Sequence, residues 1–228
     1  MTTPAAAPGA TPGAAPGPAD RRWGRRLGQL YAGLVLFAVG EALVIRAALG
    51  VIPWDVLHQG LVQRLGLTIG GWSIIVGALV LVAWIPLRER PGIGTVSNVL
   101  VIGAVLDQVL RVLPAPEAVG WRAAYLVVGI LLNGIATAAY IGARLGSGPR
   151  DGLMTGLVAR TGRSVRLVRT ALEVTVVTIG WLLGGDLGIG TVLFALAIGP
   201  VVHVFLPRLT VPVGGSVGES VGPAAHGE

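Results

Sequence analysis

The chain has 228 residues, of which 53% are hydrophobic and 12% are charged. Soluble proteins carry about 25% charged residues, so this composition excludes an ordinary soluble domain. The chain has no cysteine, which excludes disulfide frameworks, thiol nucleophiles and thiolate metal sites. Its 17 basic residues are all arginine and its net charge is +6, a balance that attracts nucleic acid or anionic lipid. We expect no nucleic-acid partner, because the orientation of a membrane protein already explains where the arginines lie.

Six apolar segments predict an all-α polytopic membrane protein. They cover residues 27–49, 71–87, 95–113, 122–143, 168–185 and 190–206. Such segments can cross a hydrocarbon core about 30 Å thick, and the alternation typical of a β-barrel is missing. Residues 1–26 and 209–228 are rich in small residues and proline, and we expect them to form disordered cytoplasmic tails. The first segment resembles a signal peptide only superficially, because it belongs to an internal repeat.

The repeat is clearest in two stretches that lie 96 residues apart. LGVIPWDVLHQGLVQRLG begins at Leu49 and LGSGPRDGLMTGLVARTG begins at Leu145. The motif GIGT likewise occurs at 92–95 and again at 188–191. We therefore divide the chain into two repeats, 27–113 and 122–208, each with three spans and one short helix (53–65 and 149–161).

Arginine counts predict the orientation of the repeats. If the N-terminus is cytoplasmic, thirteen arginines lie in inside segments and four in outside segments, as the positive-inside rule requires. Three spans per repeat is an odd number, so the second repeat enters the membrane from the opposite side. We expect a bacterial inner-membrane protein with both termini, Glu89 and Ser164 inside, and with His58, Glu117 and Asp186 outside.

The short helices begin with a repeated Pro-x-Asp motif. Proline is favoured at the first helical position, and the carboxylates of Asp55 and Asp151 suit the positive end of a helix. Thirteen residues give a helix of roughly 20 Å, too short to span. Each is either an amphipathic helix in the interface or a half-helix that dips into the membrane, and the sequence leaves both open. GIGT is either a turn with a helix cap or part of a site.

These motifs resemble a known family. LGxxPWDVLHxGL, PGxGTxxN and LGxGPRDGLMxGLxxRTGxSVxxxRTxxE are similar to motifs of the YczE group of bacterial membrane proteins, relatives of the broader YitT family. The resemblance covers about residues 27–208. It implies a bacterial inner-membrane protein with no established activity, and it supplies no catalytic residues to transfer.

Ionisable residues within the apolar segments are candidates for a substrate or ion site, because they are costly in a membrane. Glu41 lies in the first span and needs a partner on another helix, water or a proton. Asp107 and His203 occupy equivalent positions in the two repeats. We expect them either to meet near the midplane as a proton-carrying pair or to lie apart beside Arg111 and Arg208.

Two functions of different classes remain open. The first is a small secondary transporter or channel with its site between the repeats, formed by Asp55, Asp151, Glu41, Asp107 and His203. The second is a non-transporting accessory or regulatory protein that docks a partner or anionic lipid through its basic loop, 144–169. We expect no enzyme, cofactor or metal site, because catalytic and metal motifs are missing. The lipid bilayer is the expected partner, a small molecule or ion is the possible substrate, and a homo-oligomer remains possible.

Overall fold

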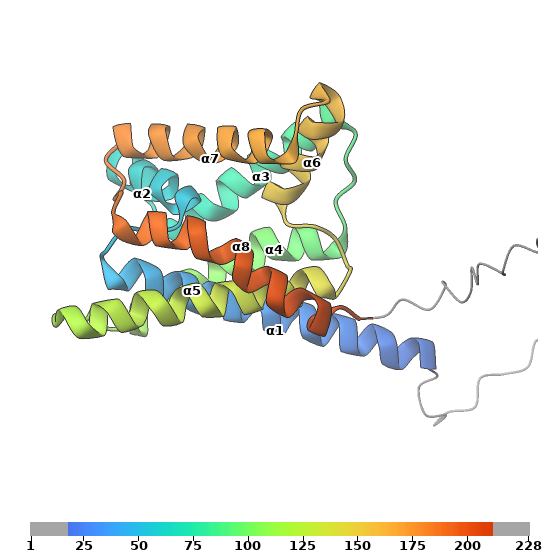
Figure 1. The fold of residues 1–228 in the computed structure, drawn as a ribbon, viewed down its shortest axis with the longest axis horizontal. Helices are drawn as coiled ribbons and strands as arrows, with labels where there is room; N and C mark the ends of the chain where they lie inside the picture. Colours follow the sequence, from blue (N-terminus) through green and yellow to red (C-terminus); the bar gives the residue numbers. More distant parts are fainter. Residues whose placement is uncertain (1–17, 212–228) are drawn as a thin grey trace, which may run out of the picture.

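The structure, a computed structural model, describes residues 18–211 as eight α-helices without a strand in that range (Figure 1). The helices are α1 (Pro18–Ala47), α2 (Pro53–Leu65), α3 (Ile69–Leu87), α4 (Ile93–Val112), α5 (Val119–Gly142), α6 (Pro149–Thr161), α7 (Val165–Leu182) and α8 (Ile189–Leu209). The all-α prediction is confirmed. Five helices, α1, α3, α4, α5 and α8, are long and apolar enough to cross a membrane.

Two differences from the sequence prediction concern α1 and α7. Helix α1 begins at Pro18, so residues 18–26, a basic segment with four arginines that we expected in the N-terminal tail, are already helical. The rest of that tail and most of the C-terminal one lie outside the described residues. Helix α7, the expected fifth span, has 18 residues and contains Arg166, Arg169 and Glu173. These charges lower its hydropathy and separate it from the five apolar helices.

The helices reproduce the sequence repeat. Each helix from α6 to α8 begins 96 residues after its counterpart among α2 to α4. Helices α1 and α5, which are also counterparts, lie side by side and run in opposite directions, along the lower edge of Figure 1. The repeated segments therefore fold into the same succession of elements.

Hydrogen bonds between the repeats are reciprocal. The Gly94 backbone N–H donates to the Leu145 carbonyl at 2.8 Å, and the equivalent Gly190 N–H donates to the Leu49 carbonyl at 2.7 Å. GIGT thus starts α4 and α8, as the turn interpretation requires, and also binds the other repeat. Gly50 is needed at this junction, because its φ is +106° and a Cβ there would lie 2.7 Å from the Gly188 nitrogen. Each repeat therefore makes with the other the same contact that it receives, as expected for two units related by a twofold axis.

Arginines from the paired helices make a second reciprocal contact. Arg26 donates to the carbonyls of Ala143 and Arg144, just beyond α5. The equivalent Arg122 donates to the carbonyls of Ala47 and Ala48, at the end of α1. Each guanidinium therefore satisfies carbonyls that the end of the partner helix leaves free.

The core follows the central helix pair, whereas the outer faces are apolar and exposed. Leu30, Leu34 and Val44 of α1 are fully buried. Ile85 on α3 is 73% exposed and Leu196 on α8 is 69% exposed. Large apolar side chains on the outside are costly in water but favourable against lipid, so this surface fits a multi-pass membrane protein.

One pair of helices breaks the match between the repeats. Helix α3 packs along α4, but the counterparts α7 and α8 are not packed along each other in this way. The other contacts are shared by the repeats: α7 packs against α2 as α3 packs against α6, and α8 packs against α5 as α4 packs against α1. The space between α7 and α8 is where the candidate site reaches the surface.

Candidate functional site

The short helix α2 begins in the protein interior and ends at the surface. Its first residues, Pro53 to Val56, are buried, whereas Leu65 at its last turn is 65% exposed. Proline occupies the first helical turn because its missing N–H needs no partner there. The preceding segment, Val51 and Ile52, is also buried. The chain therefore runs inward in an irregular segment and returns outward as a helix.

Helix α6 repeats this arrangement. Gly148 and Pro149 are buried at its start, and Thr161 is exposed at its end. Side chains from the first turns of the two short helices touch, because the Arg150 guanidinium lies 4.8 Å from the centre of the Trp54 ring. These two residues occupy equivalent positions in the repeats, 96 residues apart. A contact between equivalent residues is expected close to a twofold axis.

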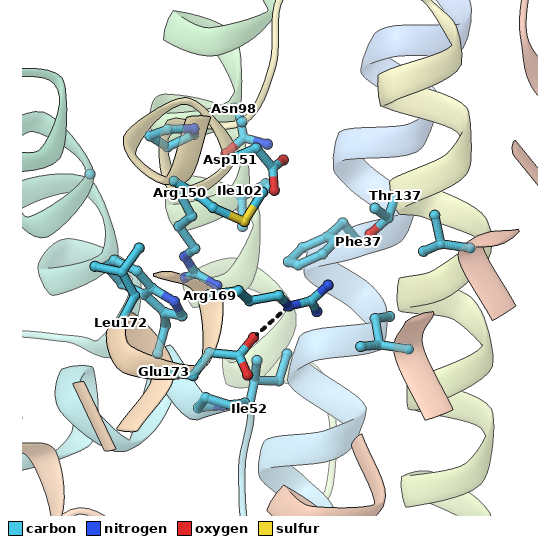
Figure 2. A pocket seen from close by; sticks show the side chains of 18 of the residues that line it. Phe37, Ile52, Asn98, Ile102, Thr137, Arg150, Asp151, Arg169, Leu172 and Glu173 are labelled. Atoms are coloured by element: carbon cyan, nitrogen blue, oxygen red, sulfur yellow. Dashed lines mark hydrogen bonds and ion pairs between the residues drawn. The ribbon is translucent and has the colours of Figure 1, made fainter. Parts of the chain in front are cut away.

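A cavity of about 420 Å³ lies where the two short helices begin. Its wall is formed by Trp54 and His58 of α2 and by Arg150 and Asp151 of α6, together with residues of every other helix from α1 to α8. Figure 2 shows Arg150 and Asp151 on one side and Phe37 and Thr137 on the other. Its mixture of apolar and charged groups suits a small polar or amphiphilic ligand.

The cavity reaches the surface between α7 and α8. Among the residues that line it, the exposed ones are Arg169 on α7 and Ala195, Gly199 and His203 on α8. Arg169 pairs with Glu173 at 3.0 Å, and Figure 2 shows this pair extending into the cavity. The opening therefore lies along the sides of two helices rather than at an end of the bundle.

A cluster of buried ionisable groups lies beside this cavity. The Nδ1 atom of His58 lies 3.0 Å from Oδ1 of Asp55, one helical turn earlier. The Glu41 carboxyl of α1 lies beside the Asp55 carboxyl. Exposure is 1% for Glu41 and 0% for Asp55 and His58. One further atom of each, Glu41 Oε2, Asp55 Oδ2 and His58 Nε2, is buried without a hydrogen-bond partner.

Asp151, the counterpart of Asp55, has different neighbours. It is half-buried, lines the cavity and lies beside the Tyr140 hydroxyl and the Arg150 guanidinium. The positions equivalent to Glu41 and His58 are Thr137 and Met154. The repeated carboxylates therefore begin equivalent helices in unlike chemical surroundings.

Asp107 and His203 do not form the ion pair considered from the sequence. Within residues 18–211, ion pairs join only His58 to Asp55 and Arg169 to Glu173. Asp107 instead accepts hydrogen bonds from Thr68 Oγ1 at 2.6 Å and from the Gly70 N–H at 3.0 Å, both at the start of α3. His203 lies at the mouth of the cavity. Of the proposed site residues, the structure thus groups Glu41 with Asp55, and places Asp151 and His203 on the cavity.

The sequence interpretation missed His58, Arg150 and Arg169 as site residues. His58 had a detectable signal, since it follows Asp55 by three residues and therefore lies on the same helix face. Arg150 and Arg169 entered the sequence interpretation as topology signals and as part of the basic docking loop, and Arg169 also as the expected partner of Glu173, an ion pair that the structure confirms at 3.0 Å. Nothing local distinguishes them from the other arginines of this loop, because their place on the cavity depends on how α6 and α7 pack.

Comparison with known proteins identifies the family. Residues 24–207 match the family of unknown function DUF6198. An uncharacterized protein of Haemophilus influenzae is 42% identical over 177 residues, which cover 78% of this chain and 81% of the relative. The uncharacterized membrane protein YczE of Bacillus subtilis is 39% identical over 181 residues, 78% of this chain and 84% of YczE. No solved structure matches the chain. The chain therefore belongs to the YczE-type family of membrane proteins that DUF6198 describes.

Proposed function

We propose that the protein is a small secondary transporter or channel whose substrate site is the cavity between the two repeats. The observation that carries this proposal is the meeting of α2 and α6 at one polar cavity, through the contact of Arg150 with Trp54. In transporters built from inverted repeats, half-helices present their positive N-terminal ends to a site near the bilayer midplane. The buried starts and exposed ends of α2 and α6 support the same role here.

The proposed architecture has six spans, α1, α3, α4, α5, α7 and α8, in two inverted repeats of three. The antiparallel contact of α1 with its counterpart α5 supports this, because it requires a twofold axis perpendicular to the helices (Figure 1). If these helices cross the membrane, that axis lies in the membrane plane. The reciprocal hydrogen bonds of Gly94 and Gly190 fit the same axis.

Helix α7 is the sixth span in this proposal. Its outer side chains Val174, Ile179 and Trp181 are 46–59% exposed, which favours a lipid environment. Arg166 lies in its first turn, where a long side chain reaches the interface. Arg169 and Glu173 neutralise each other at the cavity. In this proposal the protein lies in a bacterial inner membrane with both termini on the cytoplasmic side. Most arginines then also lie on the cytoplasmic side, as the positive-inside rule requires.

A substrate screen in proteoliposomes tests the transport proposal. Vesicles with and without protein are compared for uptake and efflux of labelled amino acids, sugars, organic anions and inorganic ions. We expect at least one class to move faster with protein. Gly199→Trp should abolish this movement, because Gly199 lines the mouth and has open space where the new side chain begins. The control Leu196→Trp, exposed on the same helix and not part of the lining, should transport normally. Equal transport by both variants would contradict the proposed site.

The exposed arginines of the loop between α6 and α7 favour a second candidate, a non-transporting protein that docks an acidic partner or anionic lipid. Arg163 and Arg166 are exposed and have no ion-pair partner within residues 18–211. In this alternative, the double variant Arg163→Gln, Arg166→Gln loses binding to the acidic partner or anionic lipid, whereas Gly199→Trp keeps it. The two proposals therefore predict opposite results for these variants.

A further inference from the structure

We propose that Glu41, Asp55 and His58 form a buried proton-binding relay beside the cavity, with His58 as the member that belongs to the cavity wall. This inference deepens the transport proposal and rests on it in one respect, since it names the proton as the coupling ion. The relay itself is a property of the described side chains and can be tested without a substrate.

The surroundings of Glu41 favour a bound proton. Its carboxyl is 1% exposed, and no ion pair in residues 18–211 joins it to a cation. The fully buried carboxyl of Asp55 lies beside it. Two adjacent negative charges in a low-dielectric interior repel strongly. In the proposed relay, the pair therefore holds one proton.

His58 connects this pair to the cavity. Its Nδ1 atom is bonded to Asp55, and its buried Nε2 atom has no partner and belongs to a residue of the cavity wall. With Nδ1–H donating to Asp55, Nε2 of the neutral ring carries the free lone pair that accepts an incoming proton in the proposed relay. The imidazolium formed is stabilised by the Asp55 carboxylate. Transfer of the Nδ1 proton to Asp55 returns the ring to neutrality, with its remaining proton on Nε2.

The other ionisable groups that line the same cavity are Tyr140 on α5, Arg150 and Asp151 on α6, Arg169 and Glu173 on α7, and His203 on α8. Arg150 lies over Trp54, and Arg169 is paired with Glu173. None of these groups forms an ion pair with Glu41, Asp55 or His58 in residues 18–211. The charge of the relay is therefore set by protons and, at longer range, by Arg150.

The second repeat argues against a purely structural role. It builds the same short helix, with proline and aspartate at the same positions, but has Thr137 and Met154 in place of Glu41 and His58. Starting the helix therefore does not require the glutamate or the histidine. A buried glutamate with an unpaired oxygen is costly, and a proton-carrying role accounts for it.

Infrared spectroscopy tests the relay on the purified protein in lipid nanodiscs. At neutral pH we expect a band from a protonated, buried carboxyl group in the wild type. Isotope-labelled glutamate or aspartate should shift this band, an assignment that needs no substitution. Glu41→Gln should remove the band, and His58→Gln should change the pH range over which it titrates. Asp107→Asn is the matched control and should leave it unchanged, because Asp107 binds α3 instead. A missing band, or one that survives Glu41→Gln, overturns the relay.

Coupling is tested separately in proteoliposomes. If the screen identifies a transported solute, an imposed pH gradient should drive its accumulation in the wild type and in Asp107→Asn, but not in His58→Gln. Accumulation that ignores the gradient overturns the proton as coupling ion, even when the infrared band is present. If no solute moves with any protein, the transport proposal and the coupling fail, whereas the infrared result still decides whether the relay binds a proton.

Discussion

Single glycines set how closely the short helices approach their neighbours. A Cβ at Gly180 of α7 would lie 2.4 Å from the backbone of Leu57, and one at Gly60 of α2 would lie 2.5 Å from the Gly180 carbonyl. The two backbones therefore touch, as small residues permit at membrane helix interfaces. This contact holds α2, and with it His58, in place.

Gly180→Ala should therefore destabilise the protein, by about 1–3 kcal/mol, because backbone atoms cannot move aside as a flexible side chain can. Gly28→Ala on α1 is the control, since a Cβ there meets nothing within 4 Å. Thermal unfolding in detergent measures both. A Gly180→Ala variant as stable as Gly28→Ala would contradict the close packing of α2 on α7.

Asp107 has a structural role at the same scale. Its carboxylate binds both Thr68 and the Gly70 N–H, which the start of α3 would otherwise leave free. We expect Asp107→Ala to lower the free energy of unfolding by about 1–3 kcal/mol, the range for hydrogen bonds to a charged group. Asp107→Asn keeps one acceptor oxygen and should cost less. A variant that unfolds like the wild type but has lost the pH dependence of transport would contradict this structural role.

At the scale of elements, α7 differs most from its counterpart. Helix α3 is strongly apolar and packs along α4, whereas α7 carries three charges and leaves a space beside α8. The charges that weaken α7 as a membrane span therefore lie on or near the cavity. A helix of this kind fits the wall of a polar site better than a lipid-surrounded position.

Cysteine labelling tests whether α7 crosses the membrane, and the chain has no cysteine of its own to interfere. Ser164 and Asp186 flank α7 and are exposed. In intact cells, an impermeant thiol reagent should label Asp186→Cys and should label Ser164→Cys only after the membrane is opened. Labelling of both positions from one side would mean that α7 does not span, and the six-span proposal would fail.

For the whole molecule, the repeats supply a nearly symmetric frame and the differences supply chemistry. Reciprocal contacts of Gly94 and Gly190 join the halves. The glutamate–aspartate–histidine cluster lies in the first repeat alone, and the opening lies between the last two helices of the second. In the transport proposal, such a frame rocks about a central site, and the unequal halves supply the proposed proton site and the opening of the cavity.

Equivalent positions in the two repeats should face opposite sides of the membrane. Leu65 and Thr161 are the last residues of α2 and α6, are exposed, and are 96 residues apart. Single cysteines there should be labelled from outside at 65 and from inside at 161. Labelling of both from the same side would contradict the inverted arrangement while leaving the sequence repeat intact.

Much of the fold follows from local signals. The turn residues Pro53 and Pro149, the GIGT motifs and the apolar runs placed most helix boundaries within a few residues. The pairing considered for Asp107 and His203 failed because it assumed that α4 and α8 meet, whereas the equivalent helices that pack together are α1 and α5. An offset along the chain locates equivalent residues, but it does not state which helices touch.

The sequence by itself determined the class of protein, the repeat and the start of each short helix, because hydropathy, spacing and proline chemistry are properties of neighbouring residues. Only the tertiary structure decided that Glu41 meets Asp55, that Arg150 covers Trp54, and that the cavity opens between α7 and α8. These contacts join residues far apart in the chain. They depend on the close approach of glycine-rich backbones and on which helix faces remain free after packing, quantities that no single segment encodes.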